Sequence, residues 1–310
     1  MSDIIDPQHN HIAVLQNQVV DVLTSGRENQ NITVLDCTLG LGGHAKAILQ
    51  KLGPQAKYIG LDTDEQNVKY AKENLKQFAS QCRFFHANFV QASEVLEVAE
   101  LNGVDAILAD LGFCSNQMDN PERGMSFMRP GPLDMRLDLS DDKTAADIVN
   151  RTAEKELADI IYQFGEERKS RRIAKAIVNQ RKIKKFETTT ELAELIAKVA
   201  PNRPNRSGKK PIHPATKTFQ ALRIAVNDEL GSLDKLLRDI PRFLNPDGIA
   251  AIISFHSLED RRVKQAFAEI SRTGYAKILT KKPIVATEDE TNDNPRARSA
   301  KLRAIQRLSS

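Results

Sequence analysis

Two carboxylates near the start of the chain flank a turn that could bind a nucleotide. The turn, DCTLGLGGH, runs from Asp36 to His44, and Asp62 follows Gly42 by about 20 residues. Glycines let a backbone approach a ligand closely, and a helix that starts after such a turn offers unpaired N–H groups. A carboxylate at the position of Asp62 can accept hydrogen bonds from both ribose hydroxyls. The pattern predicts a cofactor that contains a nucleoside.

The turn alone does not distinguish two such cofactors. Gly40, Gly42 and Ala45 fit the GxGxxA pattern of NAD-binding folds, so an NAD-dependent dehydrogenase is one hypothesis. Two features favour S-adenosylmethionine instead. Asp36 ends the first strand ahead of the glycines, and the turn LNPDG precedes a late strand, as in class I methyltransferases. Asp62 suits either cofactor.

A third carboxylate, Asp110, ends the apolar segment GVDAILAD. Open α/β sheets bind ligands in the crevice at the carboxyl ends of their strands. In a methyltransferase, a carboxylate there can accept a hydrogen bond from an exocyclic amine and hold its nitrogen in line with the methyl group. We therefore expect Asp110 to be the amine acceptor, with a strand-end cap as the alternative.

Other side chains suggest further chemistry. Cys114 could serve C5 methylation of a pyrimidine, which needs a thiolate, but no Pro-Cys pair is present and a buried thiol is more common. His44 and His256 could act as bases or substrate contacts, although a turn or core role is about as common for His256. His9 and His11 have no partner ligands nearby, so we expect no metal site.

The elements that would position these residues alternate between short apolar strands and helices, which predicts a parallel sheet covered on both faces. We expect strands at 32–36, 58–62, 82–87, 104–110 and 249–255, and helices at 45–52, 64–78, 216–229, 233–243 and 258–270. Two further strands, within 275–284 and 294–308, should be joined by an acidic loop, EDETND. Asp64 is the expected N-cap of the second helix.

The alternation stops after Asp110. The segment from Asp110 to Asp138 lacks periodicity but mixes apolar and charged side chains, which indicates a folded loop with a polar task. Helix-like segments follow at 153–164, 166–181 and 191–199, and Thr188 and Glu191 have the spacing of a capping box. A Pro-rich basic stretch, 201–214, ends this helical insertion.

The composition limits the class of protein. With 310 residues, 40% of them apolar, the chain can bury one sizeable core and a second, smaller unit. It has no run of 18 apolar residues and no signal-peptide layout, so we expect a soluble, cytoplasmic protein. The three cysteines are widely spaced, which supports neither a disulfide framework nor a zinc knuckle.

The positive charge is concentrated in one part of the chain. From Lys143 to Lys217 there are 18 Lys or Arg against 9 Asp or Glu, although the whole chain carries only +4. Such clustering is the expected footprint of a polyanionic partner, because cations that neutralise phosphates release counterions. Solvated helix faces are the alternative explanation.

With these residues placed, the chain closely resembles the RsmH (MraW) family of bacterial 16S rRNA cytosine-N4 methyltransferases. The resemblance rests on long motifs in order along the chain: DxTxGxGGH at 36–44, DLG through GPLDMRLD at 110–138, HPATKTFQALRIAVNDEL at 213–230, ISFHSLEDR at 253–261 and NPRARSAKLR at 294–303. The chain departs from the family beside Asp110, where FCSNQM replaces VSSPQL.

The resemblance implies a class I S-adenosylmethionine-dependent methyltransferase with a Rossmann-like sheet in residues 1–117 and 216–310. Residues 118–215 would be an all-helical inserted domain that helps to recognise RNA. The implied cofactor contacts come from Gly42, Gly43, His44, Asp62, Phe89, Asp110 and Gln117. The implied substrate is the N4 amine of a cytidine in the decoding region of 16S rRNA, within the small ribosomal subunit.

Around Asp110 we expect Ser115, Asn88 and His256 as neighbours of the amine. The sequence is compatible with a monomer or a homodimer and with no membrane contact. A different class of function stays open beside the enzyme, namely a ribosome-assembly factor that binds rRNA and uses the cofactor site only for structure.

Overall fold

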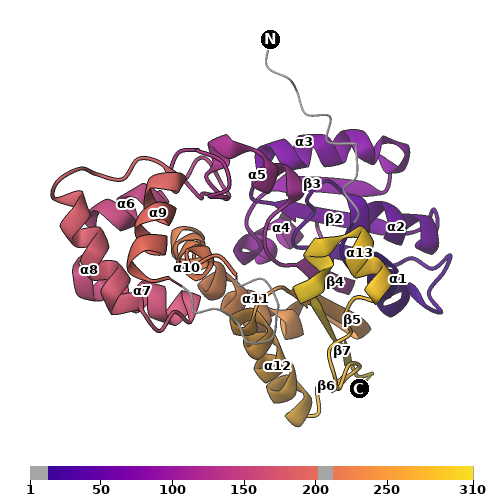
Figure 1. The fold of residues 1–310 in the computed structure, drawn as a ribbon. Coiled ribbons are helices and arrows are strands. Elements are labelled where there is room, and N and C mark those ends of the chain that lie inside the picture. The colour runs from indigo at the N-terminus through magenta and orange to yellow at the C-terminus, as the bar shows by residue number, and fades with distance from the viewer. Residues whose placement is uncertain (1–12, 202–211, 310) are drawn as a thin grey trace. The chain divides into compact units, whose positions relative to one another are not determined.

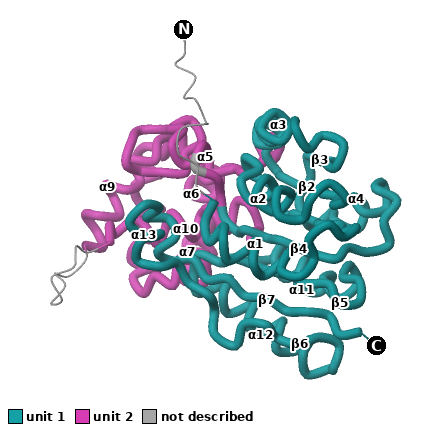
Figure 2. Tube along the Cα trace, turned by 90° about the vertical axis from the view of Figure 1, so that its right-hand side faces the viewer, with its two compact units in different colours: residues 1–112, 230–310 teal, residues 113–229 magenta. Residues whose placement is uncertain are grey.

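The computed structural model describes residues 13–201 and 212–309 (Figure 1). His9, His11 and most of the Pro-rich stretch 201–214 lie outside the described residues. The chain divides into two compact units (Figure 2), a sheet unit of Met1–Gly112 and Leu230–Ser310 and a helical unit of Phe113–Glu229. Within the described residues, every helix is too short or too polar to span a membrane.

The sheet unit is built on one seven-stranded sheet with the strand order β3-β2-β1-β4-β5-β7-β6. The strands are β1 (Thr33–Asp36), β2 (Lys57–Asp62), β3 (Cys82–His86), β4 (Val104–Asp110), β5 (Leu244–Ser254), β6 (Ala276–Ile278) and β7 (Lys301–Arg307). The first five strands are parallel, and β7 runs antiparallel to both β5 and β6. NAD-binding sheets have the order 3-2-1-4-5-6. The antiparallel β7, which lies between β5 and β6, therefore distinguishes this sheet from NAD-binding sheets. This topology confirms the class I methyltransferase fold.

Helices cover both faces of the sheet, because a parallel sheet is apolar on each face. One face carries α1 (Gln16–Thr24), α2 (Gly43–Leu52) and α3 (Glu65–Asn74). The other face carries α4 (Ala92–Val98), α11 (Glu229–Phe243) and α12 (Ser257–Arg272). Side chains alternate along a strand, so the neighbours Val34 and Leu35 enter opposite cores.

The five parallel strands expected from the sequence are confirmed, and so is the N-cap at Asp64, whose side chain accepts the N–H of Gln66 at 3.0 Å. The acidic segment EDETND is not a loop, because it forms α13 (Glu288–Asp293). Thr287 caps it by accepting the N–H of Glu290 at 3.1 Å. Acidic residues in the first turn suit the positive end of the helix dipole, which explains the helix without an apolar face.

The helical unit has its own apolar core. Its helices are α5 (Ser115–Asp119), α6 (Ala145–Arg151), α7 (Glu154–Gly165), α8 (Ser170–Arg181), α9 (Thr189–Val199) and α10 (Thr216–Asn227). The capping box at Thr188 and Glu191 is confirmed. The unit extends beyond the expected range of 118–215, because α10 packs on α7 and contributes Phe219 and Leu222 to this core.

The segment that follows Asp110 folds around a buried arginine. Arg123 ends a short 3-10 helix, Pro121–Arg123, and donates hydrogen bonds to the backbone oxygens of Arg136 at 3.2 Å and Leu137 at 2.7 Å. Gly124 comes next with φ +64°, and the backbone of Pro132 and Asp134 lies directly against its Cα. Close backbone contacts of this kind explain why a segment without periodicity is nevertheless folded.

Replacing Gly124 by Ala should destabilise the helical unit by more than the cost of placing Ala in a left-handed backbone conformation. An added Cβ would lie 2.2 Å from the Pro132 oxygen and 2.8 Å from the Asp134 nitrogen, which are backbone atoms. Gly26, with φ +73° and nothing within 4 Å of such a Cβ, is the matched control. We expect Gly26→Ala to cost about 1 to 2 kcal/mol and Gly124→Ala about 1 to 3 kcal/mol more. Urea unfolding checks this, and equal losses would contradict it.

Candidate active site

The carboxyl ends of the parallel strands bring three acidic side chains to one edge of the sheet. Asp36 ends β1, Asp62 ends β2 and Asp110 ends β4. β1 lies between β2 and β4, so the turn that follows Asp36 is flanked by the other two carboxylates. This is the edge at which open α/β sheets bind ligands.

Hydrogen bonds from both neighbouring strands hold the glycine turn. On one side the N–H of Gly40 donates to Asp62 Oδ2 at 2.8 Å. On the other side the N–H of Asp110 donates to Thr38 Oγ1 at 2.6 Å. The turn is therefore fixed to β2 and β4 before any ligand binds.

Packing requires the glycines of this turn as much as ligand binding would. Gly42 has φ +83°, and a Cβ there would lie 2.9 Å from the Leu75 side chain beyond α3. A Cβ on Gly43 would lie 3.2 Å from Ala13 Cβ. The absence of these side chains lets the start of α2 pack closely against Leu75 and Ala13.

Asp36 is an anchor of the fold. Its carboxylate is buried and accepts the hydroxyl of Tyr58 at 2.7 Å and the N–H of Thr38 at 3.0 Å. Burial raises the pKa of Asp36 to about 6, although these two hydrogen bonds act in the opposite direction. The sequence does not indicate these roles of Tyr58 and Thr38, whose only signals are a hydroxyl at the start of β2 and another just after β1.

Asp62 is also buried, and burial raises its pKa to about 6. Oδ1 accepts the N–H of Asp64 at 2.8 Å and the side-chain amide of Asn67 at 3.2 Å, while Oδ2 accepts Gly40. A carboxylate offers about four acceptor positions. About one position is left on Oδ2, so accepting two ribose hydroxyls would require displacement of the longer bond from Asn67.

His44 and Asp110 form the polar centre of the edge. His44 Nε2 lies 3.4 Å from Asp110 Oδ2, and the His44 residue is only 6% exposed. Among the described residues, neither ring nitrogen of His44 nor Oδ1 of Asp110 has a hydrogen-bond partner. Buried polar atoms are normally hydrogen-bonded, so these three atoms suit a polar ligand.

Phe89 and Asn88 follow β3, on the far side of β2. Phe89 starts a 3-10 helix, Phe89–Gln91. The N–H of Ala87 donates to the backbone oxygen of Asp62 at 3.0 Å, which places this segment beside Asp62. Asn88 caps the 3-10 helix by accepting the N–H of Val90 at 3.0 Å. Since β2 and β1 separate β3 from β4, Asn88 follows a strand about 14 Å from that of Asp110. The role expected for Asn88 beside the amine stays a prediction.

His256 follows β5 and is the N-cap of α12. Its Nδ1 accepts the N–H of Glu259 at 3.4 Å, and its Nε2 lies 3.2 Å from Glu259 Oε1. Glu259 in turn accepts the N–H of Phe255 at 2.8 Å. His256 therefore caps the helix through Nδ1, whereas its Nε2 has no hydrogen-bond partner among the described residues, and the role expected for His256 beside the amine stays a prediction.

Ser115 and Gln117 belong to α5 in the helical unit. Gln117 Oε1 accepts the N–H of Cys114 at 2.9 Å, so its amide caps the start of this helix. The roles expected for Ser115 beside the amine and for Gln117 at the cofactor remain predictions.

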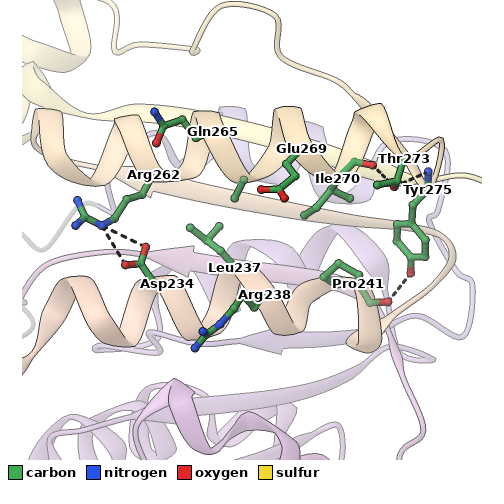
Figure 3. A pocket seen from close by; sticks show the side chains of 11 residues that line it. Asp234, Leu237, Arg238, Pro241, Arg262, Gln265, Glu269, Ile270, Thr273 and Tyr275 are labelled. Carbon is green, nitrogen blue, oxygen red and sulfur yellow. Dashed lines mark hydrogen bonds and ion pairs between the residues drawn. The ribbon is translucent and has the colours of Figure 1, made fainter.

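One groove of the sheet unit lies between α11 and α12 and has a volume of about 590 Å³ (Figure 3). Leu237, Pro241, Ile270 and Tyr275 line it, together with an ion pair between Asp234 and Arg262. None of the predicted site residues lines this groove. The candidate site is therefore the carboxyl edge of the sheet, where Asp36, Asp62 and Asp110 lie, rather than this groove.

Substituting His256 separates capping from catalysis. Asn is among the best N-caps, so His256→Asn should change the free energy of unfolding by less than about 0.5 kcal/mol, whereas His256→Ala should cost about 1 kcal/mol. Urea unfolding of both variants checks this difference. If both variants were as stable as the wild type and both were inactive, the ring would be catalytic rather than structural.

Comparison with known proteins identifies a methyltransferase family that matches nearly the whole chain. A model of the MraW methylase family matches residues 8–308. The ribosomal RNA small subunit methyltransferase H of Koribacter versatilis is 47% identical over 307 residues, which cover 97% of this chain and 95% of that protein. The protein of the same name from Clostridioides difficile is 40% identical over 320 residues, covering 97% of this chain and 100% of that protein. With a family match of this extent and relatives of this identity, the chain belongs to the MraW methylase family.

Proposed function

We propose that this protein transfers the methyl group of S-adenosylmethionine to the N4 amine of a cytidine in small-subunit ribosomal RNA. The relatives' names support the RNA, since they are called methyltransferases of the small-subunit ribosomal RNA. The observation that carries the proposal is the carboxylate of Asp110 at the end of β4. Its buried Oδ1 has no hydrogen-bond partner among the described residues, and its Oδ2 lies 3.4 Å from His44 Nε2.

The edge of the sheet fits the proposed cofactor. When bound, S-adenosylmethionine supplies an electrophilic methyl group on a sulfonium. Gly42 and Gly43 would let it approach the start of α2, and Asp62 Oδ2 would accept a ribose hydroxyl. Phe89, beside Asp62, would lie on the adenine side. The ring nitrogens of His44, which have no hydrogen-bond partner in the described part of the chain, support a further polar contact.

Asp110 would act on the nucleophile. The exocyclic amine of cytosine shares its lone pair with the ring, and an acceptor for one N–H favours the rehybridised nitrogen. A fixed carboxylate also holds that nitrogen in line for attack, so positioning and electrostatics contribute together. Asp110 is held for this role by the bond from its own N–H to Thr38, and its Oδ2 lies 3.4 Å from His44 Nε2.

A base inside a stacked helix cannot reach such an edge, so the target cytidine must be unstacked. The helical unit would then recognise the surrounding RNA, since it contains the basic part of the chain. Ser115 and Gln117, at the beginning of this unit, remain the residues expected near the amine and the cofactor.

Replacing Asp110 by Asn should lower methyl incorporation into small subunits from cells that lack the enzyme by about 10²-fold or more. The amide keeps the shape of the side chain but loses the negative acceptor. Asp105→Asn is the matched control, because Asp105 is near the opposite end of β4 and bonds to Thr33 and Asn245. Nucleoside mass analysis should identify N4-methylcytidine as the product.

The outcomes separate the competing functions. A wild-type product methylated at C5, or no product at all, would contradict the proposal. Normal subunit maturation by an inactive Asp110→Asn variant would favour an assembly factor. Full activity of Asp110→Asn would remove Asp110 from the mechanism.

A further inference from the structure

We propose that the exposed face of α8 is the surface that contacts the RNA backbone; this inference rests on the proposed function and locates the RNA contact on the helical unit. Four exposed cations are named here the α8 stripe: Arg171, Arg172 and Lys175 on this face, and Lys182 directly after the last residue of the helix. The opposite face, with Ile173, Ala174 and Ile177, is buried in the core of the unit. The packing of α8 therefore fixes which side chains face solvent.

The charge of α8 is of one sign. From Ser170 to Phe186 the chain has seven Lys or Arg and no Asp or Glu. Arg171, Lys175 and Lys182 are separated by four and then seven residues, which places them on one side of the helix. They span about 16 Å at 1.5 Å per residue. A row of cations of this length can reach several phosphates of one strand.

The start of α8 shows that Arg171 and Arg172 are not placed for helix stability. Negative side chains are favoured near a helix N-terminus and positive ones are disfavoured. α6, α7 and α9 each have acidic residues in the first turn. α8 has none, and Arg171 and Arg172 occupy its first turn instead. A partner that supplies negative charge would offset this local conflict.

Other cations of the same unit have structural partners. Lys169 donates to the backbone oxygens of Ala200 and Pro201, Arg181 donates to Val149, and Lys184 pairs with Glu191 at 2.5 Å. No residue of the α8 stripe forms an ion pair with a carboxylate in the part of the chain that the structure describes. The stripe is thus available to an external polyanion.

The test replaces three stripe residues, Arg171, Lys175 and Lys182, by Gln. The matched control replaces Lys69, Lys72 and Lys76 by Gln, which removes the same charge from the exposed side of α3 and the turn after it. Two of these control lysines already pair with carboxylates, Lys69 with Glu65 at 3.0 Å and Lys76 with Glu73 at 2.6 Å. The affinity for protein-free small-subunit rRNA and for unmethylated small subunits is measured from about 50 to 200 mM KCl.

We expect the stripe variant to bind both forms of the RNA at least tenfold more weakly at low salt. The slope of log K against log[KCl] should become shallower by about 0.7 to 0.9 per cation removed, or about 2 to 3 in total. S-adenosylmethionine affinity and thermal unfolding should stay unchanged, and the control should retain the wild-type slope.

Equal slopes for the stripe variant and the wild type would overturn the inference, and so would equal losses in the stripe and control variants. Loss of binding to subunits with normal binding to protein-free rRNA would also overturn it, because the contact would then be to a ribosomal protein. Failure of the proposed function is separate, since it would appear as a wild-type enzyme that makes no N4-methylcytidine.

Discussion

The site depends on the attachment of one glycine turn to strands on both sides of it. Asp62 accepts the N–H of Gly40 from the β2 side, and Thr38 accepts the N–H of Asp110 from the β4 side. Parallel strands make this possible, because all their carboxyl ends emerge at the same edge. The attachment fixes the backbone that would receive the cofactor and, through the same turn, the carboxylate that would receive the amine.

The attachment requires buried charge. Asp36 and Asp62 are both desolvated, so the pKa of each is raised to about 6. The folded state therefore binds protons more tightly than the unfolded chain, and this contribution to stability is full below pH 3.8 and is lost as pH rises through about 6. At neutral pH both carboxylates are ionised and held by hydrogen bonds. Keeping these fixed acceptors buried at the sheet edge therefore lowers the stability of the folded protein.

The sequence predicts the parallel strands and the three strand-end carboxylates, because apolar β-branched segments and terminal acids are local patterns. It does not predict α13, whose stability comes from a cap and first-turn acids rather than from an apolar face. Nor does it show that Asn88 and His256 cap helices, or that Tyr58 supports Asp36, because those roles depend on which strands are neighbours. For the same reason the sequence does not place α10 in the helical unit, since α10 belongs with α7 only through packing.

The pH dependence of S-adenosylmethionine binding tests most directly whether the Asp62 end of the turn holds the cofactor. Ribose hydroxyls donate to the ionised carboxylate, so protonation of Asp62, with its pKa of about 6, should oppose binding. Calorimetry between about pH 5 and 7.5 should show wild-type affinity rising by up to about tenfold per pH unit below 6 and levelling off above it. Asp62→Asn should bind more weakly with a flat profile. A flat wild-type profile, or the same slope in Asp62→Asn, would contradict this account of the site.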